Sequence, residues 1–260
     1  VTTLLERLSG KGTRTSVLVG ESGVGKTALV HELAHRLAAR NEGWVVVRVA
    51  PSDLLAGTKY LGEWQSKLSS VVRELQIESG SVLYLTDIWN LSTVGKSESN
   101  EETMADLLKE FIESHRISVL GEVTEAQIAA HFGRSPSFKN LFAELRVEPV
   151  PHASVRPILA NVAEHFAATR SVRFEDSALD RAIEITDRFL PYRHQPGKAI
   201  ELVERAVHYA REKASAGEGD AVSPLLVEKT FAIYSGLPLF ILSDREQRRT
   251  ADIRQFFRER

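Results

Sequence analysis

The sequence predicts an α/β fold in which helices flank a parallel sheet, followed by a small all-helical domain. In the first half of the chain, short apolar runs alternate with amphipathic helical patterns, which is typical of a parallel sheet covered on both faces. After Pro151 the apolar runs stop and amphipathic helical patterns follow one another. A glycine-rich segment, Gly20–Thr27, lies between the first apolar run and the first helical pattern.

Five apolar runs are the predicted strands. Each is short and rich in valine, leucine or isoleucine, and helical patterns separate the first four. The runs are Ser16–Val19, Trp44–Val49, Ser81–Thr86, Ile117–Leu120 and a fifth within Phe142–Val150. Because ligands bind at the carboxyl ends of the strands in such sheets, the residues that follow each run are the candidates for function.

Helical periodicity connects these runs and continues after them. The predicted helices are Lys26–Arg40, Tyr60–Gln76, Glu102–Ser114, Ser154–Thr169, Asp176–Phe189, Gly197–Lys213 and Pro224–Tyr234. We predict a large nucleotide-binding domain over residues 1–150 and a small helical lid domain over residues 151–213. Residues 214–260 are predicted to be a linker and a connector toward a further module, because they begin with a Gly-rich break and end in a polar, Arg-rich stretch.

Composition limits the classes of function. The 260 residues are 43% hydrophobic and carry a formal net charge of −2, so no overall positive charge attracts nucleic acid. The chain has no cysteine, which excludes disulfides, zinc–thiolate sites and thiol catalysis. No apolar run approaches the roughly 20 residues that span a bilayer, and no signal-peptide pattern is present. We therefore expect a cytoplasmic protein without membrane partners.

The glycine-rich segment matches the phosphate-binding pattern G-x-x-x-x-G-K-[ST] and stands directly between a predicted strand and a predicted helix. Its backbone N–H groups and the positive end of the helix dipole converge on phosphate oxygens in such loops. In this pattern Lys26 reaches the β- and γ-phosphates, and the hydroxyl of Thr27 ligates Mg²⁺. The sequence therefore predicts that ATP or ADP binds with Mg²⁺ at Gly20, Glu21, Ser22, Gly23, Val24, Gly25, Lys26, Thr27 and Ala28.

A phosphate-loop site also needs a carboxylate at the end of a neighbouring strand to hold Mg²⁺. Asp87 follows the third apolar run and is the predicted metal residue beside Thr27. The next residue, where a general base is expected, is Ile88, and an isoleucine cannot accept a proton from water. Glu122, two residues before Thr124 on the adjacent predicted strand, is the alternative carrier of that base.

Five segments of the chain share their residues with one protein family. They are Gly20–Val30 (GESGVGKTALV), Ala56–Glu63 (AGTKYLGE), Leu120–Thr124 (LGEVT), Gln195–Ile200 (QPGKAI) and Ser235–Pro238 (SGLP). These segments resemble the AAA+ ATPases of the Clp chaperone and unfoldase family, in particular the first of their two ATPase modules. The resemblance covers nearly the whole chain, and it implies a P-loop AAA+ fold with a small helical domain.

By this resemblance, the chain is an ATP-binding module of a hexameric ring that unfolds polypeptide clients. Lys59, Tyr60 and Leu61 match the axial pore loop of the family, which grips the client. Tyrosine suits that role, because an exposed aromatic ring offers apolar contact area without reading sequence. The resemblance therefore implies polypeptide clients and self-association into a ring as the partners of this chain.

The resemblance also implies nucleotide-site residues outside the phosphate loop. The catalytic residues would be Lys26, Asp87 and Thr124, with Thr124 at the family's polar sensor position. Three residues of the helical domain join the expected nucleotide contacts: Ile158, Leu159 and Lys198. Of these, Ile158 and Leu159 match the pair that packs against adenine.

Two departures from the family pattern predict that hydrolysis is slow or absent. The family's catalytic glutamate is replaced by Ile88, and its paired arginine fingers fall on Asn140 and Leu141. An arginine finger contributes on the order of 10³ or more in rate, so both departures weaken the same chemical step. Two alternatives stay open: an active motor that uses a displaced base such as Glu122, and a nucleotide-gated scaffold or adaptor without unfolding activity.

Overall fold

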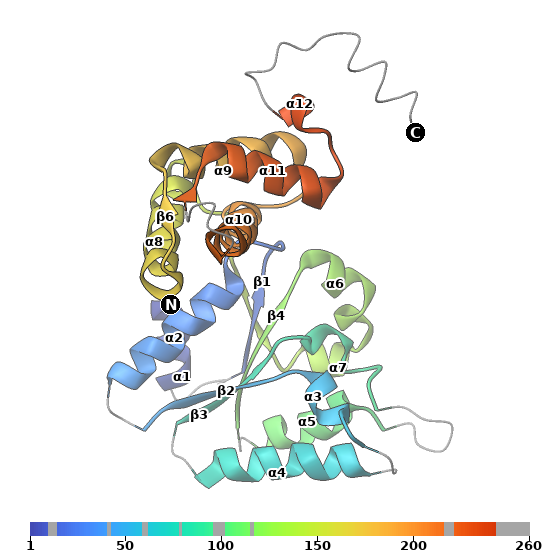
Figure 1. The fold of residues 1–260 in the computed structure, drawn as a ribbon. Coiled ribbons are helices and arrows are strands. Elements are labelled where there is room, and N and C mark those ends of the chain that lie inside the picture. Colours follow the sequence, from blue (N-terminus) through green and yellow to red (C-terminus); the bar gives the residue numbers. More distant parts are fainter. Residues whose placement is uncertain are drawn as a thin grey trace. The chain divides into compact units, whose positions relative to one another are not determined.

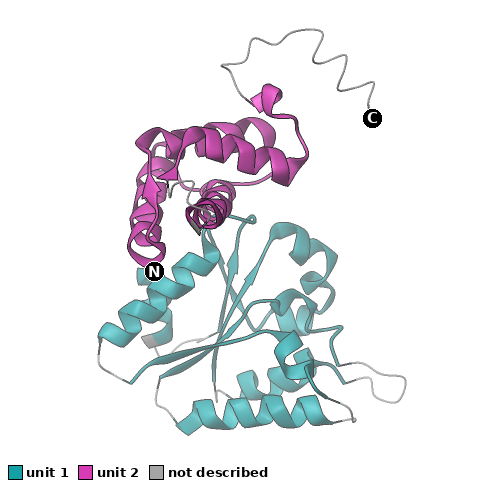
Figure 2. Cartoon of the chain, in the orientation of Figure 1, with its two compact units in different colours: residues 1–148 teal, residues 149–260 magenta. Residues whose placement is uncertain are grey.

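The computed structural model (Figure 1) describes residues 1–9, 15–40, 43–58, 62–77, 80–95, 102–114, 117–215 and 221–242. The chain divides into two compact units, residues 1–148 and residues 149–260 (Figure 2). Each unit has buried apolar cores of its own. Within the described residues, no helix combines the length and the apolar character needed to cross a bilayer.

Unit 1 is built on a five-stranded sheet in which all the strands run parallel (Figure 1). The strands are β1 Ser16–Val19, β2 Val45–Val49, β3 Ser81–Leu85, β4 Ser118–Val123 and β5 Ala143–Arg146, in the spatial order β2-β3-β4-β1-β5. They fall on the five runs that the sequence predicts, and the α/β fold class is confirmed. Strand β1 lies between β4 and β5, so the residues at its carboxyl end have neighbours on both sides.

Alternate side chains of the strands enter two separate cores, one on each face of the sheet. Val17 and Val19 of β1 belong to one core, and Leu18 between them belongs to the other. The helices that cover the two faces are α4 Glu63–Ile77 and α5 Met104–Glu113 for the first core, and α1 Thr2–Ser9 and α2 Lys26–Ala39 for the second. Because successive side chains point to opposite faces, both faces of the sheet are apolar, and helices cover each of them, as is typical of a parallel sheet.

Short elements outside the predicted patterns follow the strands. They are α3 Pro51–Leu55, η1 Ile88–Asn90, α6 Glu125–Ala130, η2 Phe132–Arg134 and α7 Pro136–Lys139. The rings of Phe132, Phe138 and Phe142 lie 5.1 to 5.9 Å apart in edge-to-face pairs and join η2 and α7 to the core. Elements this short contain too few residues for a helical period to be read from the sequence.

Unit 2 is helical, with one small two-stranded sheet. Its helices are α8 His152–Arg170, α9 Asp176–Phe189, α10 Gly197–Ser215, α11 Pro224–Ser235 and α12 Leu239–Leu242, and its strands are β6 Arg173–Phe174 and β7 Ala221–Val222. Helix α11 packs against α9 and α10, with Val227 and Phe231 fully buried. The sequence pattern assigns residues 214–260 to a connector, whereas the structure places α11 inside the core of unit 2, because its apolar face completes that core.

Ile88 packs tightly against the backbone of β4. Its side chain is fully buried, and a Cβ atom added at Gly121 would lie 2.6 Å from its Cδ1 and 2.8 Å from its Cγ2. These distances are well inside van der Waals contact, so glycine is what allows η1 to approach β4 this closely. The turn that carries Asp87 is therefore held in place by the packing of the next residue.

Replacing Gly121 by alanine should destabilise unit 1 by about 1–3 kcal/mol, the usual cost of extra atoms in a packed core. The double variant Gly121→Ala/Ile88→Ala should lose less stability than the two single variants added together, because removing the Ile88 side chain makes room for the new methyl group. Denaturant unfolding of the three variants measures this coupling. Additive losses would show that the two residues do not constrain each other.

Candidate nucleotide-binding site

The phosphate-binding segment connects β1 to α2. Gly25 forms the cap of the helix in the left-handed conformation, with φ at 103°, which glycine adopts without strain. Because a glycine has no side chain to cap the helix, the first backbone N–H groups of α2 keep their hydrogen-bonding capacity for a ligand. These amides, together with Lys26 as the first residue of the helix, favour the binding of an anion.

Lys26 bonds to its own loop in this structure. Its Nζ atom donates hydrogen bonds to the carbonyl oxygen of Gly20, at 2.7 Å, and to that of Glu21, at 3.0 Å. Burial lowers the pKa of Lys26, while the negative charges of Glu122 and Glu21 act in the opposite direction. The ammonium group is therefore held over the loop, where phosphate oxygens could replace the two carbonyl oxygens as its acceptors.

The hydroxyl of Thr27 donates a hydrogen bond to the carboxylate of Glu122, with Oγ1 3.2 Å from Oε1 and 3.1 Å from Oε2. Glu122 belongs to β4, the strand that pairs with β1, and it is in register with Leu18. Parallel pairing thus brings a carboxylate to the start of α2 from 95 positions along the chain. Sequence reasoning proposed Glu122 as a displaced base, and the structure joins it to Thr27.

The hydroxyl of Tyr84, on β3, lies close to both of these residues. Tyr84 is 1% exposed, and its hydroxyl makes no hydrogen bond of normal geometry within the described chain. Burial and the nearby Glu122 carboxylate raise the pKa of Tyr84 to about 12, so the phenol keeps its proton at neutral pH. Sequence reasoning missed this residue because it belongs to an apolar run. The signal available was a single polar atom within that run.

Asp87, the carboxylate predicted to accompany Thr27, has other partners. Its Oδ2 accepts a hydrogen bond from the hydroxyl of Thr86 at 3.3 Å, and its Oδ1 accepts one from the indole N–H of Trp89 at 3.4 Å. In the part of the chain that the structure describes, no hydrogen bond joins Asp87 to Thr27. The metal-binding and catalytic roles of Asp87 stay predictions.

Thr124, the predicted sensor, caps helix α6. Its hydroxyl accepts a hydrogen bond from the backbone N–H of Gln127 at 3.1 Å, and its own N–H donates to Oε1 of Gln127 at 2.8 Å. This reciprocal capping box uses the acceptor capacity of the hydroxyl at the end of β4 and leaves its proton available. A contact between Thr124 and a nucleotide stays a prediction.

Other predicted residues of unit 1 lie away from the phosphate loop in sequence. The pore-loop residues Lys59, Tyr60 and Leu61 lie outside the described residues. Asn140 is exposed after α7, whereas Leu141 packs against the core of the sheet. Position 140 therefore belongs to the surface, and position 141 serves packing.

The predicted contacts of the helical unit lie on α8 and α10. Leu159 is fully buried in the core of unit 2, and Ile158 is half-buried. Lys198 is also buried: its Nζ lies 2.8 Å from Oδ1 of Asp187 and donates to the carbonyl oxygen of Leu190 at 3.3 Å. Leu159 and Lys198 thus have structural roles inside unit 2. A contact of any of these residues with nucleotide stays a prediction.

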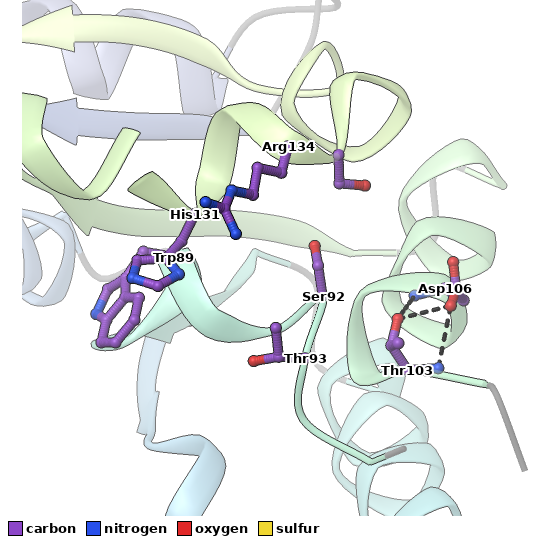
Figure 3. Close-up of a pocket in the computed structure, with 8 residues that line it drawn as sticks. Trp89, Ser92, Thr93, Thr103, Asp106, His131 and Arg134 are labelled. Atoms are coloured by element: carbon purple, nitrogen blue, oxygen red, sulfur yellow. Dashed lines mark hydrogen bonds between the residues drawn. The ribbon is translucent and has the colours of Figure 1, made fainter. Parts of the chain in front are cut away.

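A polar cavity of about 360 Å³ lies between η1, the start of α5 and η2 (Figure 3). The residues that line it are Trp89, Ser92, Thr93, Thr103, Asp106, His131, Arg134 and Ser135. The rings of Trp89 and His131 lie 4.9 Å apart, and the Thr103 hydroxyl donates to Asp106 at the cap of α5. None of the lining residues belongs to the phosphate loop, so the cavity is distinct from the predicted nucleotide site.

Two family profiles match the chain. That of the ATPase family associated with various cellular activities (AAA) matches residues 16–130, and that of the AAA lid domain matches residues 152–224. Chaperone protein ClpB of Mycoplasmoides gallisepticum is 30% identical over 210 residues, which are 78% of this chain and 29% of that protein. The chain belongs to the Clp-type AAA+ family. ClpB of Malacoplasma penetrans is 27% identical over 228 residues, which are 85% of this chain and 32% of that protein.

The Clp-type module thus spans about a third or less of the length of these curated relatives. Its fold is also that of solved Hsp104 structures. A structure of the S. cerevisiae Hsp104–ADP complex gives a TM-score of 0.77 at 24% identity, covering 94% of this chain and 42% of that chain. A structure of Hsp104 with ATPγS and FITC casein gives a TM-score of 0.75 at the same identity, covering 43% of that chain. These similarities establish the fold, a parallel sheet followed by a helical part.

Replacing Asp187 by asparagine should destabilise unit 2 by about 1–3 kcal/mol, because the buried ammonium of Lys198 loses its anionic partner. Glu204→Gln is the matched control, since Glu204 pairs with Arg170 at 3.2 Å near the surface, where ion pairs contribute little. Thermal unfolding of both variants measures the difference. Equal, small losses would show that the Lys198–Asp187 pair contributes no more than a surface pair.

The same pair predicts how the stability of unit 2 depends on pH. Burial alone would raise the pKa of Asp187, but hydrogen bonds from Lys198, Gln195 and His152 outweigh it and lower the pKa. A carboxylate with a lowered pKa stabilises the fold above its unfolded-state pKa, and that contribution is lost as pH falls through the lowered value. The stability difference between wild type and Asp187→Asn should therefore shrink in acid and persist at neutral pH.

Proposed function

We propose that this chain is the ATP·Mg²⁺-binding module of a Clp-like hexameric unfoldase, and that it hydrolyses ATP slowly or not at all. The observation that carries the proposal is the phosphate loop between β1 and α2. It presents uncapped amides at the start of a helix, an ammonium group at Lys26, and a hydroxyl at Thr27 that is bonded to a carboxylate. In phosphate-loop sites, the amides and the ammonium group bind phosphate oxygens, and the hydroxyl binds the divalent cation.

The residues present fit a magnesium nucleotide. Mg²⁺ prefers oxygen ligands and in such sites takes few from the protein, since phosphates and waters supply the rest. Thr27 and Glu122 provide a hydroxyl and a carboxylate side by side. Among the described residues, no group of three or more histidine or carboxylate side chains could hold a metal by itself, which agrees with a cation that arrives with the nucleotide. Bound Mg²⁺ would neutralise phosphate charge.

The weak hydrolysis that we propose rests on two positions. Ile88 follows Asp87 but is fully buried against Gly121, so the residue after Asp87 brings no base to the nucleotide. Asn140 is exposed but uncharged, and Leu141 packs inward, so neither can stabilise charge on the phosphate of a neighbouring subunit. These positions support binding without efficient turnover.

The proposed action on polypeptides rests on the family and on the sequence of one segment. The similar ClpB proteins are chaperones by name, and one similar Hsp104 structure contains casein. We propose that Lys59, Tyr60 and Leu61 form the pore loop of a cytoplasmic hexameric ring and contact the client there. A second ATPase module, joined after residues 214–260, would then supply most of the hydrolysis.

One observation favours an alternative function, an active ATPase motor that uses Glu122 as a displaced base. Glu122 lies on β4 and accepts a hydrogen bond from Thr27 at 3.1 Å. Its side chain is half-buried, so water can reach it. A general base must lie within hydrogen-bonding reach of the attacking water. The two functions differ in whether removing this carboxylate stops turnover or weakens the metal-dependent binding of ATP.

Lys26→Ala should lower the affinity for ATP at least about tenfold, because the variant loses charge-assisted hydrogen bonds to phosphate. Arg36→Ala is the matched control: it removes one positive charge from the same helix, where Arg36 pairs with Glu32 on the surface. Calorimetric titration with ATP and Mg²⁺ measures both affinities. Phosphate release by the wild type should be close to that of Lys26→Ala.

Two results would count against this proposal separately. A wild-type chain that does not bind ATP contradicts the nucleotide site itself. Binding with turnover far above that of Lys26→Ala contradicts the proposed loss of hydrolysis and favours the motor that uses Glu122.

A further inference from the structure

The phosphate loop already has a carboxylate at its metal-binding hydroxyl, and that carboxylate comes from β4. Both oxygens of Glu122 lie within 3.2 Å of Oγ1 of Thr27. A threonine hydroxyl has one proton and two lone pairs. Because the Thr27 hydroxyl donates its hydrogen bond to the carboxylate, the lone pairs of its oxygen remain available to a cation. The carboxylate also keeps acceptor capacity, since one shared proton does not fill its two oxygens.

A second, independent observation points into the same place. The hydroxyl of Tyr84 is buried, with the residue 1% exposed, and it has no hydrogen-bond partner within the described chain. Thr27 and Glu122 are among the polar side chains near it, together with Arg48. A buried hydroxyl without a partner is unfavourable, and such groups mark places where a water molecule or ion completes the structure. A hydrated cation at Thr27 would bring such waters close to it.

The carboxylate that follows β3, Asp87, has local hydrogen-bond partners. Asp87 accepts hydrogen bonds from Thr86 and Trp89, its neighbours in sequence. The turn that carries it is fixed, because Ile88 is buried under it against Gly121. The hydrogen bonds of Asp87 thus orient it toward Thr86 and Trp89, whereas Glu122 already contacts Thr27.

We propose that Glu122, together with Thr27, holds the divalent cation of the bound nucleotide, and that Tyr84 is a positioning residue for water bound beside this carboxylate. The metal-holding carboxylate has thus moved from the strand that precedes Asp87 to the neighbouring strand β4. This inference rests on the proposed binding of ATP·Mg²⁺. Glu122 beside the metal is a ligand or an anchor for metal-bound water, and it is then unavailable as the base of an active motor.

The test compares how much Mg²⁺ improves the binding of a fluorescent ATP analogue to the 260-residue chain, relative to EDTA. In the wild type the improvement should be about tenfold or more, since the cation links the phosphates to the protein. Glu122→Gln should lose most of this improvement, whereas Asp87→Asn, the matched change of a carboxylate to an amide, should keep it. In EDTA, Glu122→Gln should bind at least as tightly as the wild type, because a negative charge near Lys26 is gone.

Two further measurements separate a metal role from a structural one. Electron paramagnetic resonance of Mn²⁺ in place of Mg²⁺ should detect less protein-bound metal in the ternary mixture with Glu122→Gln than with Asp87→Asn. Tyr84→Phe should keep its melting temperature and lose part of the Mg²⁺ improvement, because the phenol no longer holds metal-bound water beside the carboxylate. If Glu122→Gln does not fold, Glu122→Asp keeps the charge but withdraws it from Thr27, and it should lose part of the improvement.

Several outcomes would overturn the inference. A Glu122→Gln chain that keeps the full Mg²⁺ improvement contradicts it, and so does a loss of the improvement in Asp87→Asn. A folded Glu122→Gln chain with normal Mg²⁺-dependent binding but abolished turnover would make Glu122 the base instead. A wild type that binds ATP equally well in Mg²⁺ and EDTA overturns this inference and leaves nucleotide binding standing. A wild type that binds no ATP in either condition fails the proposed function itself.

Discussion

The parallel pairing of β1 with β4 is the constraint on which the candidate site depends. The register sets Leu18 beside Glu122 and Val19 beside Val123, and the backbone N–H of Gly20 continues the ladder to the carbonyl oxygen of Val123. Since side chains alternate along a strand, a shift by one residue would turn Glu122 away from α2. The same alternation turns Gly121 toward Ile88 on the opposite face. One short strand thus supports the turn after β3 on one face and supplies a carboxylate to the phosphate loop on the other.

Helix α2 is fixed against the sheet by apolar packing. Val30, Leu33 and Leu37 are buried in the core beneath the sheet, at helical spacings of three and four residues. This packing orients the first turn, so that Lys26 lies over the loop and Thr27 meets Glu122. Lys26, Thr27 and Glu122 are half-buried or exposed, yet their positions follow from apolar contacts deeper in the fold. Preorganisation of this kind lowers the entropy cost of ordering the side chains of the site when a ligand binds.

The sequence predicted the parts of this structure that are encoded locally. The five strands and the long helices have clear periods, and the phosphate loop is a contiguous motif whose chemistry can be read from Gly20 to Thr27. The link between Thr27 and Glu122 spans 95 positions and depends on strand register, so no local pattern could specify it. The place of Tyr84 in the site could not be predicted for a related reason: its hydroxyl lies near Glu122 only because β3 pairs with β4. Helix α11 was predicted at nearly its observed bounds, but its packing against α9 and α10 was not, because that packing depends on residues distant in sequence.

In the proposed function, binding and hydrolysis depend on different elements of this fold, so binding can persist without hydrolysis. The groups proposed to hold the nucleotide come from β4, from α2 and from the loop between β1 and α2, whereas the groups expected to cleave it would come from the turns after β3 and α7. At those turns Ile88 and Leu141 now pack against the core. A carboxylate at position 88 would be buried without a partner, which is strongly unfavourable, so that turn cannot regain a base by one substitution. Position 88 can thus serve either the packing of the core or hydrolysis, whereas the residues of the phosphate loop are not needed for that packing. In the proposed function, the nucleotide at this site therefore acts as a ligand that stabilises and regulates the module.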